Sequence, residues 1–323
     1  MTVNRRFLYW GVFLVVLGGV LVSADLRALD TPALTDVLRL WPLAVVAIGL
    51  SLVLRRTRLS LPGLLLAAAA PGLVLGAAFA VAPRFVGECG VHGDRPGVVS
   101  VATTRGSFDG PATVSVRSGC GSLNVKTAPG SGWQLDAGNT TGRTPRVDSS
   151  ARSLSIDATN DAGQSFLDGG RDTWDLALPT SEIDDLSLVV FAGYGQVDLP
   201  DARIGRLVMT VNAAKVNVDA SLASVSEVSG AVNVGALTLR LPAASDLVGS
   251  LRVGAGSIRI CAPSGLGLRI TSAGTAERIM VDGSQEHASE WQSFDYASTA
   301  HHADLQVRAT FGAVEINPIG GCE

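Results

Sequence analysis

Hydrophobic residues are distributed in two different ways along this chain. Up to residue 82 they form long continuous runs, whereas from about Gly106 onward they alternate with polar residues and are interrupted by Gly, Asn, Asp and Pro. Long apolar runs are typical of membrane-spanning helices, and strict alternation is typical of half-buried β-strands. The pattern therefore predicts a helical N-terminal part followed by an all-β domain.

Three apolar runs predict transmembrane helices, at about residues 7–24, 37–54 and 59–82. Arginines precede the first run and separate the second from the third, whereas the loop between the first two carries three Asp and one Arg. The positive-inside rule then places the N-terminus in the cytoplasm and everything after the third run outside. We expect a multi-pass plasma-membrane protein, with a bundle of three transmembrane helices at residues 1–83 and an extracytoplasmic β domain at residues 84–323.

Two features of the N-terminal part leave alternatives open. Arg5 and Arg6, followed by an apolar stretch that ends in Val22-Ser23-Ala24, also resemble a cleaved signal peptide, and cleavage would leave two spans and the same outer domain. In the third run Ala68, Gly72 and Gly76 recur every four residues, which would place small side chains on one helix face as a packing site. An Ala- and Gly-rich run also produces this spacing by chance.

A unit of two strands joined by a tight turn of small residues recurs in the β part. Its copies lie at residues 114–129, 186–200, 207–219, 228–242, 247–263 and 305–318. Aligned residues Val197, Val216, Leu237 and Ile258 are separated by 19, 21 and 21 positions. A period near twenty predicts a β-solenoid, in which stacked coils bury each other's apolar residues.

Two stretches of the β part depart from this period. Residues 130–180 alternate more weakly and include an expected loop at residues 160–170. Residues 283–303 are polar, with Trp291, Phe294 and Tyr296 among them. We expect them to cap the end of the stack, because an exposed terminal layer would associate with other chains.

The charge differs in sign between the two parts. Residues 1–82 carry seven Arg and three Asp, a net charge of +4, so the formal net charge of −4 for the whole chain leaves −8 for residues 83–323. An acidic outer domain argues against nucleic acid as a partner.

The four cysteines, Cys89, Cys120, Cys261 and Cys322, all fall in the predicted outer domain and none forms a C-x-x-C pair. Two disulfides are the economical interpretation outside the cytoplasm. Spacing leaves three pairings open, of which we favour Cys89 with Cys120 and Cys261 with Cys322, because these would tie each end of the stack to its neighbour.

Candidate chemical sites are weak. The histidines do not show metal-ligand spacing as a group, although His301, His302 and Asp304 lie close together, so no metal or other cofactor is expected. The candidate acids sit singly at turns, where Asp bonds its own backbone, and no catalytic set is found, so we expect a protein that is not an enzyme. The residues considered are His92, His287, His301, His302, Asp184, Asp185, Asp198 and Asp201. Tyr194, at a repeat corner, either is displayed for binding or covers its own turn.

Short motifs carry a resemblance to known families. Residues 7–18 (F-x-x-W-G-x-x-L-V-x-L-G) and 40–50 (L-W-P-L with I-G-L) resemble the LiaI/LiaF-like transmembrane region. Residues 174–179 (W-x-L-x-L-P), 193–199 (G-x-G-x-V-x-L) and 254–260 (G-A-G-S-I-R-I) resemble toastrack or LiaF C-terminal domains, a group that also carries the adhesin name.

The resemblance implies a bacterial plasma-membrane protein of the cell-envelope stress response. It would be a non-catalytic sensory or regulatory module, whose partners are the lipid bilayer and a membrane sensor kinase or another envelope protein. The alternative is a structural or adhesin-like surface protein, whose exposed repeat edges self-associate or bind a surface.

Overall fold

The computed structural model describes residues 98–158, 170–181, 183–272, 278–281, 284–286 and 290–317, together with ten positions nearer the N-terminus, at 11–12, 14–16, 18–19, 69, 73 and 89. The chain divides into two compact units, Met1–Gly87 and Glu88–Glu323. All the described strands belong to the second unit.

The predicted fold class is corrected in its N-terminal part. Helix before the first strand is described only in short pieces between positions 11 and 19 and at positions 69, 73 and 89, and no described helix is long and apolar enough to cross a membrane. Apolar composition meets the length criterion for a span but does not by itself determine that the chain is one continuous helix. The three-helix transmembrane bundle, and with it the multi-pass plasma-membrane location, is therefore not what the structure supports. Ala68, Gly72 and Gly76 lie outside the described residues.

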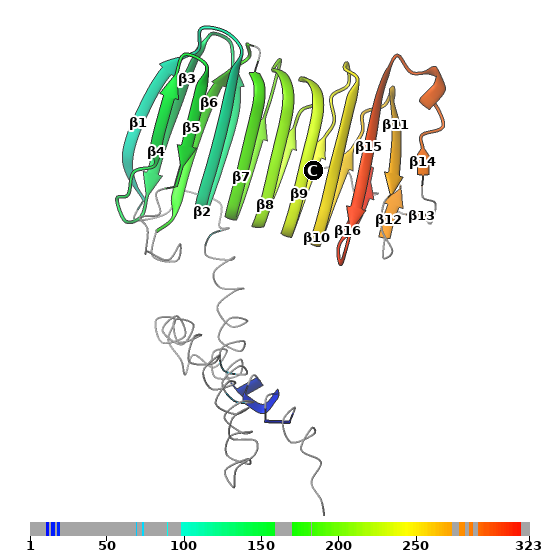
Figure 1. The fold of residues 1–323 in the computed structure, drawn as a ribbon, viewed down its shortest axis with the longest axis horizontal. Coiled ribbons are helices and arrows are strands. Elements are labelled where there is room, and N and C mark those ends of the chain that lie inside the picture. The colour runs from blue at the N-terminus through cyan, green and yellow to red at the C-terminus, as the bar shows by residue number, and fades with distance from the viewer. Residues whose placement is uncertain are drawn as a thin grey trace, which may run out of the picture. The chain divides into compact units, whose positions relative to one another are not determined.

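The described part of the second unit is built almost wholly from β-strands (Figure 1). Sixteen strands form one hydrogen-bonded sheet, whose main path runs β1-β3-β6-β2-β7-β8-β9-β10-β15-β11-β14. The elements are β1 (Val99–Ser107), β2 (Ala112–Ala128), β3 (Gly132–Asn139), β4 (Arg146–Ser150), β5 (Ser153–Asp157), β6 (Asp172–Pro179), β7 (Ile183–Asp198), β8 (Arg203–Asp219), β9 (Ser224–Arg240), β10 (Leu247–Cys261), β11 (Leu266–Ser272), β12 (Arg278–Val281), β13 (Ser284–Glu286), β14 (Glu290–Gln292), the 3₁₀ helix η2 (Tyr296–Ser298), β15 (His301–Ala309) and β16 (Ala313–Ile316).

Five long strands, β2, β7, β8, β9 and β10, lie side by side and form the centre of the domain (Figure 1). Each is continued by different neighbours in its two halves: the first half of β2 pairs with β5 and the second with β6, and β10 pairs likewise with β15 and β16. The two halves therefore belong to two faces. We call the first halves with β4, β5, β15, β11 and β14 the front face, and the second halves with β1, β3, β6, β16, β12 and β13 the rear face.

The core lies between these two faces. Inward side chains alternate with outward ones along every long strand, and the inward ones are almost fully buried. A Cβ placed on Gly230, in the first half of β9, would lie 3.3 Å from Cδ2 of Leu237 in the second half. The inner sides of the two halves thus contact each other directly, and burial of this apolar surface is the main stabilising contribution to the fold.

The repeat expected from the sequence is seen directly in the parallel pairing. Val190 pairs with Val211, and Val211 pairs with Val232, so successive coils advance by 21 residues. The sequence analysis aligned Val197 with Val216, whereas in the structure Val197 pairs with Val218. The error is two residues because alternation has a period of two, so a slip of that size keeps every inward residue inward.

A row of glycines lies where the long strands turn from the front face to the rear face. Gly121, Gly193, Gly235 and Gly256 have φ values between +117° and +147°, and Ala214 occupies the same register position on β8. A Cβ on Gly193 would overlap the carbonyl oxygen of Gly121, and one on Gly235 would overlap that of Ala214. Glycine is therefore required at these positions for two reasons. It tolerates the positive φ, and without a Cβ atom it allows the neighbouring coil to approach closely.

The structure describes most of the two stretches that depart from the period. Residues 130–180, expected to alternate weakly, contain β3, β4, β5 and β6, which extend both faces beyond β2. Most of the expected loop at residues 160–170 lies outside the described residues. At the other end β14 pairs antiparallel with β11 and is followed by η2, so this segment does lie over the end of the stack.

A disulfide joins Cys89 to Cys120, beside the glycine row. The carbonyl oxygen of Cys89 would lie 2.7 Å from a Cβ on Gly193, which places Cys89 against the turn of the next coil as well. Cys261 is also disulfide-bonded, and Cys322 lies outside the described residues. The even number of cysteines thus indicated disulfides correctly.

Replacing Gly235 with Ala should destabilise the domain by about 2 kcal/mol or more, because the new methyl group meets the Ala214 carbonyl and φ is unfavourable. Gly130 is the matched control: its φ of +121° is close to the +119° of Gly235, but a Cβ there meets no atom within 4 Å. Denaturant unfolding of the two variants separates the steric effect from the backbone strain. Equal destabilisation by both would show that the close approach does not matter.

Replacing both Cys89 and Cys120 with Ser should lower the free energy of unfolding by about 3 to 4 kcal/mol, because the disulfide closes a loop between residues 31 positions apart. Urea denaturation under oxidising conditions measures the loss. Adding a reductant to the double variant then reports separately on the disulfide of Cys261. A double variant within about 1 kcal/mol of the parent would contradict the expectation.

Candidate binding surface

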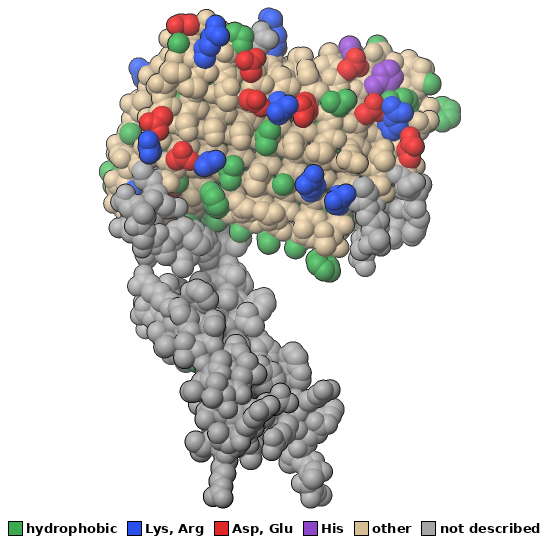
Figure 2. All heavy atoms as spheres, viewed as in Figure 1, with side chains coloured by type: hydrophobic (Ala, Val, Ile, Leu, Met, Phe, Trp, Pro, Cys, Tyr) green, Lys and Arg blue, Asp and Glu red, His purple; other side chains and the backbone are tan. Residues whose placement is uncertain are grey.

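A row of charged side chains crosses the front face at one register position. Asp185 on β7 pairs with Arg206 on β8, Arg206 with Glu227 on β9, and Asp304 on β15 with Arg269 on β11. Figure 2 shows acidic and basic side chains alternating across this face. Parallel in-register strands place equivalent positions about 4.8 Å apart, so residues 21 or more positions apart in sequence become immediate neighbours.

Two ion pairs hold parts of this charged row together. Nε of Arg206 lies 3.0 Å from Oε2 of Glu227, with 52% and 44% of the two side chains exposed. Arg269 donates two hydrogen bonds to Asp304, from Nε to Oδ1 at 2.8 Å and from Nη2 to Oδ2 at 3.1 Å. Exposed pairs of this kind contribute little to stability, so the row is better regarded as a property of the surface than as a support for the fold.

The charged row is interrupted at one strand. Val248 on β10 lies between Glu227 and Asp304 in the register, and 56% of its side chain is exposed. Further along the same strands, Arg252 and Arg308 are register partners and both are exposed. The front face therefore combines an apolar step, flanked by two carboxylates, with a cationic pair.

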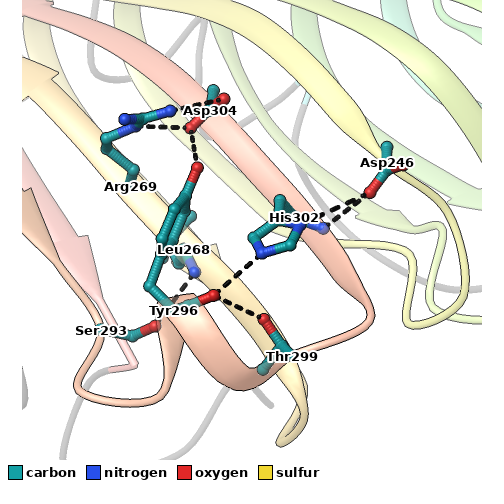
Figure 3. A network of polar contacts seen from close by, with 8 residues as sticks. All are labelled: Asp246, Leu268, Arg269, Ser293, Tyr296, Thr299, His302 and Asp304. Carbon is teal, nitrogen blue, oxygen red and sulfur yellow. Dashed lines mark hydrogen bonds and ion pairs between the residues drawn. The ribbon is translucent and has the colours of Figure 1, made fainter.

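A cluster of polar contacts joins the end of the charged row to the C-terminal cap, which we define as residues 290–300 (Figure 3). The hydroxyl of Tyr296 donates to Oδ1 of Asp304 at 2.9 Å, and the guanidinium of Arg269 lies 4.9 Å from the centre of the tyrosine ring. The ring of His302 packs against the same tyrosine at 4.8 Å. Tyr296 is thus one of the residues through which the cap contacts the front face, together with Ser293, which exchanges hydrogen bonds with the backbone of Leu268.

The charges of this cluster shift two acid–base equilibria. Hydrogen bonds from Arg269, and then from Tyr296, hold the pKa of Asp304 below its ordinary value. Partial burial, and then the hydrogen bond to the Asp304 carboxylate, raise the pKa of Tyr296. Asp304 is therefore ionised and Tyr296 neutral at physiological pH, which is the arrangement that the hydrogen bond between them requires.

The rear face carries a different kind of surface. Tyr194 donates its hydroxyl hydrogen to Oε1 of Gln196 and accepts a bond from Nδ2 of Asn217, both at 2.8 Å. Gln196 in turn donates to Asp198 at 2.7 Å. Tyr194, left open by the sequence between display and covering, is half-buried and tied to its neighbours on the sheet.

The edge of the solenoid where the glycines lie exposes apolar side chains. Phe191 and Val234 are about half exposed, and Phe311, at the turn between β15 and β16, is 89% exposed. These residues lie beside the turn glycines of successive coils. Val234 precedes Gly235 in sequence, and the backbone nitrogen of Phe311 donates to the carbonyl oxygen of Gly254, two residues before the turn glycine Gly256.

The acids singled out from the sequence do not converge on one place. Asp185 joins the charged row, Asp198 accepts a bond from Gln196 on the rear face, and Asp201 occupies a return turn with φ of +56°. Among the described residues no three His, Cys, Asp or Glu side chains are grouped so as to hold a metal ion. His92 and His287 lie outside those residues.

A half-buried polar site near the N-terminal end was missed by the sequence analysis. Oδ1 of Asn139 accepts bonds from the backbone nitrogen and the hydroxyl of Thr141, both at 2.7 Å, and its Nδ2 donates to Oδ1 of Asp172 at 2.8 Å. Removal of Asp172 from water raises its pKa to about 6, although bonds from Asn139 and the backbone of Gly119 partly offset the shift. Asn139 is fully buried, and the only sequence signal for this site was a polar residue at the end of a strand.

Comparisons with known proteins give little beyond this geometry. The sequence matches no described protein family and no curated protein. Among solved structures, it is similar to a protein of Clostridium sporogenes provisionally described as a cell adhesion protein, with 13% identity over 67% of this chain and 99% of that chain and a TM-score of 0.45. Two provisionally described adhesins, from Bacteroides fragilis and Parabacteroides merdae, each share 11% identity.

The two adhesins cover 68% and 67% of this chain and 96% and 95% of their own, with TM-scores of 0.31. These values are too low to assign a function. The descriptions of these solved structures share the adhesin name with the expected resemblance, and at these TM-scores the likeness carries no argument about fold or function. None of the comparisons supports the LiaI/LiaF-like transmembrane region or a role in envelope stress.

Replacing Asp172 with Asn should make stability less dependent on pH. A carboxyl whose pKa is raised on folding, here from 3.8 to about 6, stabilises the fold below pH 4, and that contribution is lost as the pH rises through 6. The wild-type advantage at pH 5.0 over pH 7.5 should therefore shrink by on the order of 1 kcal/mol in the variant. Asp175→Asn, an exposed change on the same strand, is the control, and thermal or urea unfolding at both pH values is the measurement. An unchanged difference would contradict the assignment.

Proposed function

We propose that the β domain is a non-catalytic, adhesin-like module that binds a macromolecular surface through its front face. The observation that carries the proposal is the charged row, in which acidic and basic side chains from β7, β8, β9, β15 and β11 share one register position. Such a row presents charges at a fixed spacing on a rigid, two-faced scaffold. Complementary charge at regular intervals favours fast, salt-sensitive association with an extended partner.

Three further features support a surface that binds other molecules over one that transforms them. The ionised groups of the charged row pair across strands, as Arg206 does with Glu227, and do not converge on a cavity. The exposed Val248 between two carboxylates offers an apolar contact for the stem of a partner's basic side chain. The exposed Arg252 lies within the same face and suits an acidic group of the partner.

The test uses beads coated with the full-length chain and measures their adhesion to bacterial cells and to each other. We expect adhesion above that of albumin-coated beads, and we expect it to weaken between 50 and roughly 500 mM salt, because exposed charges are screened. Arg206→Glu reverses a charge in the row and should reduce adhesion severalfold. Bead–bead aggregation alone would identify a second copy of the chain as the partner surface.

Arg259→Glu is the matched control on the rear face. Arg259 is about as exposed as Arg206 and likewise forms an ion pair, with Glu315 at 2.9 Å. It should leave adhesion unchanged, and thermal unfolding verifies that both variants remain folded. Equal losses in the two variants, or adhesion no greater than that of albumin, would refute a role for the front face.

A further inference from the structure

Two imidazole rings converge on one carboxylate at the start of β15. Nδ1 of His301 and Nδ1 of His302 lie 3.8 and 3.9 Å from Oδ1 of Asp246. Asp246 belongs to the return between β9 and β10, and the backbone nitrogen of His302 donates to the same oxygen at 2.8 Å (Figure 3). The carboxylate is therefore fixed in front of both rings, although it is 74% exposed on its outer side.

The other nitrogen of His302 determines how the ring is protonated. Nε2 lies 2.9 Å from the carbonyl oxygen of Tyr296, which can only accept a hydrogen bond, so Nε2 carries the hydrogen of the neutral ring. Nδ1 then turns a lone pair toward Asp246. Nδ1 of His301 is buried and makes no hydrogen bond within the described residues. In the neutral state the ring of His302 therefore gains nothing from the carboxylate that it faces.

We propose that His301, His302 and Asp246 form a proton-operated latch for the C-terminal cap. A proton added to Nδ1 of His302 converts a lone pair that faces Asp246 into an N–H group directed at a negative oxygen, and a protonated His301 adds a second positive charge beside the same oxygen. His302 then links the cap to the body of the solenoid, because its Nε2 binds the cap residue Tyr296 while its Nδ1 binds Asp246. The latch is closed when the rings are protonated and open when they are neutral.

The charges around the rings agree with this direction. From β15 itself Asp304 attracts a protonated His302, and from β11 Arg269 repels it, but these two are bound to each other and largely offset. From the cap, Tyr296 contacts His302 through its ring and carbonyl, and Glu290 acts on Arg269. The negative charge of Asp246, on the β9–β10 return, therefore decides that protonation of the two rings is favoured.

Closure of the latch would also fix the end of the charged row, because Tyr296 donates to Asp304. The proposal therefore concerns regulation of the front face. It does not depend on what that face binds, since the measurement below monitors only the cap. Failure of the adhesion test would leave it standing, and failure of the test below would leave the adhesion proposal standing.

Hydrogen–deuterium exchange of the full-length chain tests the latch at pH 5.5 and pH 7.5 in EDTA, with rates corrected for intrinsic exchange. Peptides covering residues 290–300 should exchange roughly three to ten times more slowly at pH 5.5, as expected for two partly exposed ion pairs. Asp246→Asn should abolish the difference, and its amide oxygen can still accept the backbone bond from His302. Asp295→Asn removes an exposed charge from the cap itself and should leave the difference intact.

His301→Gln and His302→Gln provide a second measurement that keeps Asp246. Each should reduce the pH effect, and His302→Gln should reduce it more because only His302 contacts the cap carbonyl. The proposal is overturned if the corrected exchange of the cap is the same at both pH values, or if Asp246→Asn retains the full difference. It is also overturned if the difference appears only after Zn²⁺ is added, since a metal ion and not a proton would then bridge the rings.

Discussion

The close approach of neighbouring backbones at the turn glycines determines the geometry of the whole β domain. At each of these glycines a neighbouring backbone places a carbonyl oxygen where a Cβ atom would otherwise lie, as Gly121 does at Gly193, whereas β8 carries Ala214 at the same position. This contact can form only if the coils are stacked in register, because a displacement along the strand would bring a side chain into the same space. Because this edge aligns the strands of both faces, residues paired between β7, β8 and β9 differ by 21 positions in both halves of each strand.

Register alignment also explains why surface chemistry appears as rows. Arg206 and Glu227 are distant in sequence, yet they form an ion pair because their strands are neighbours at equivalent positions. The amide groups of Gln196 and Asn217 meet at the hydroxyl of Tyr194 on the rear face for the same reason. A substitution in one coil therefore changes the environment of two others, which makes the faces of the domain sensitive to single charges while the core remains unaffected.

The sequence predicted the strands and their stacking well, because alternation and period are local signals that need no knowledge of distant contacts. It misplaced Val197 by two residues, since the hydrophobic pattern cannot distinguish registers that differ by a full pleat. It understated residues 130–180, where the partner strands are supplied by β2 and not by a repeat neighbour. In the N-terminal part, hydropathy alone gave a three-helix bundle that the structure does not support.

Candidate sites were harder to predict than strands. The sequence drew attention to His301 and His302 as a pair and to Tyr296 separately. Asp246 precedes His302 by 56 residues, and only the pairing of β10 with β15 brings these two residues together. The Asn139–Asp172 contact likewise depends on the pairing of β3 with β6, which joins residues 33 positions apart in sequence. Pairings that skip a coil leave no periodic trace in the sequence, so the residues they join cannot be matched from spacing.

The constant 21-residue step has a consequence for how this molecule can change in length. Removing one complete coil, for instance by joining β7 directly to β9, would delete one strand from each face and would restore every pairing with the residues one layer further on. A deletion one residue shorter than a coil would shift the following strand by one position, so that each of its side chains would move to the opposite face of the sheet. Growth or shrinkage of the domain is thus quantised in whole coils, and the distance between its two ends is adjustable without redesign of either end.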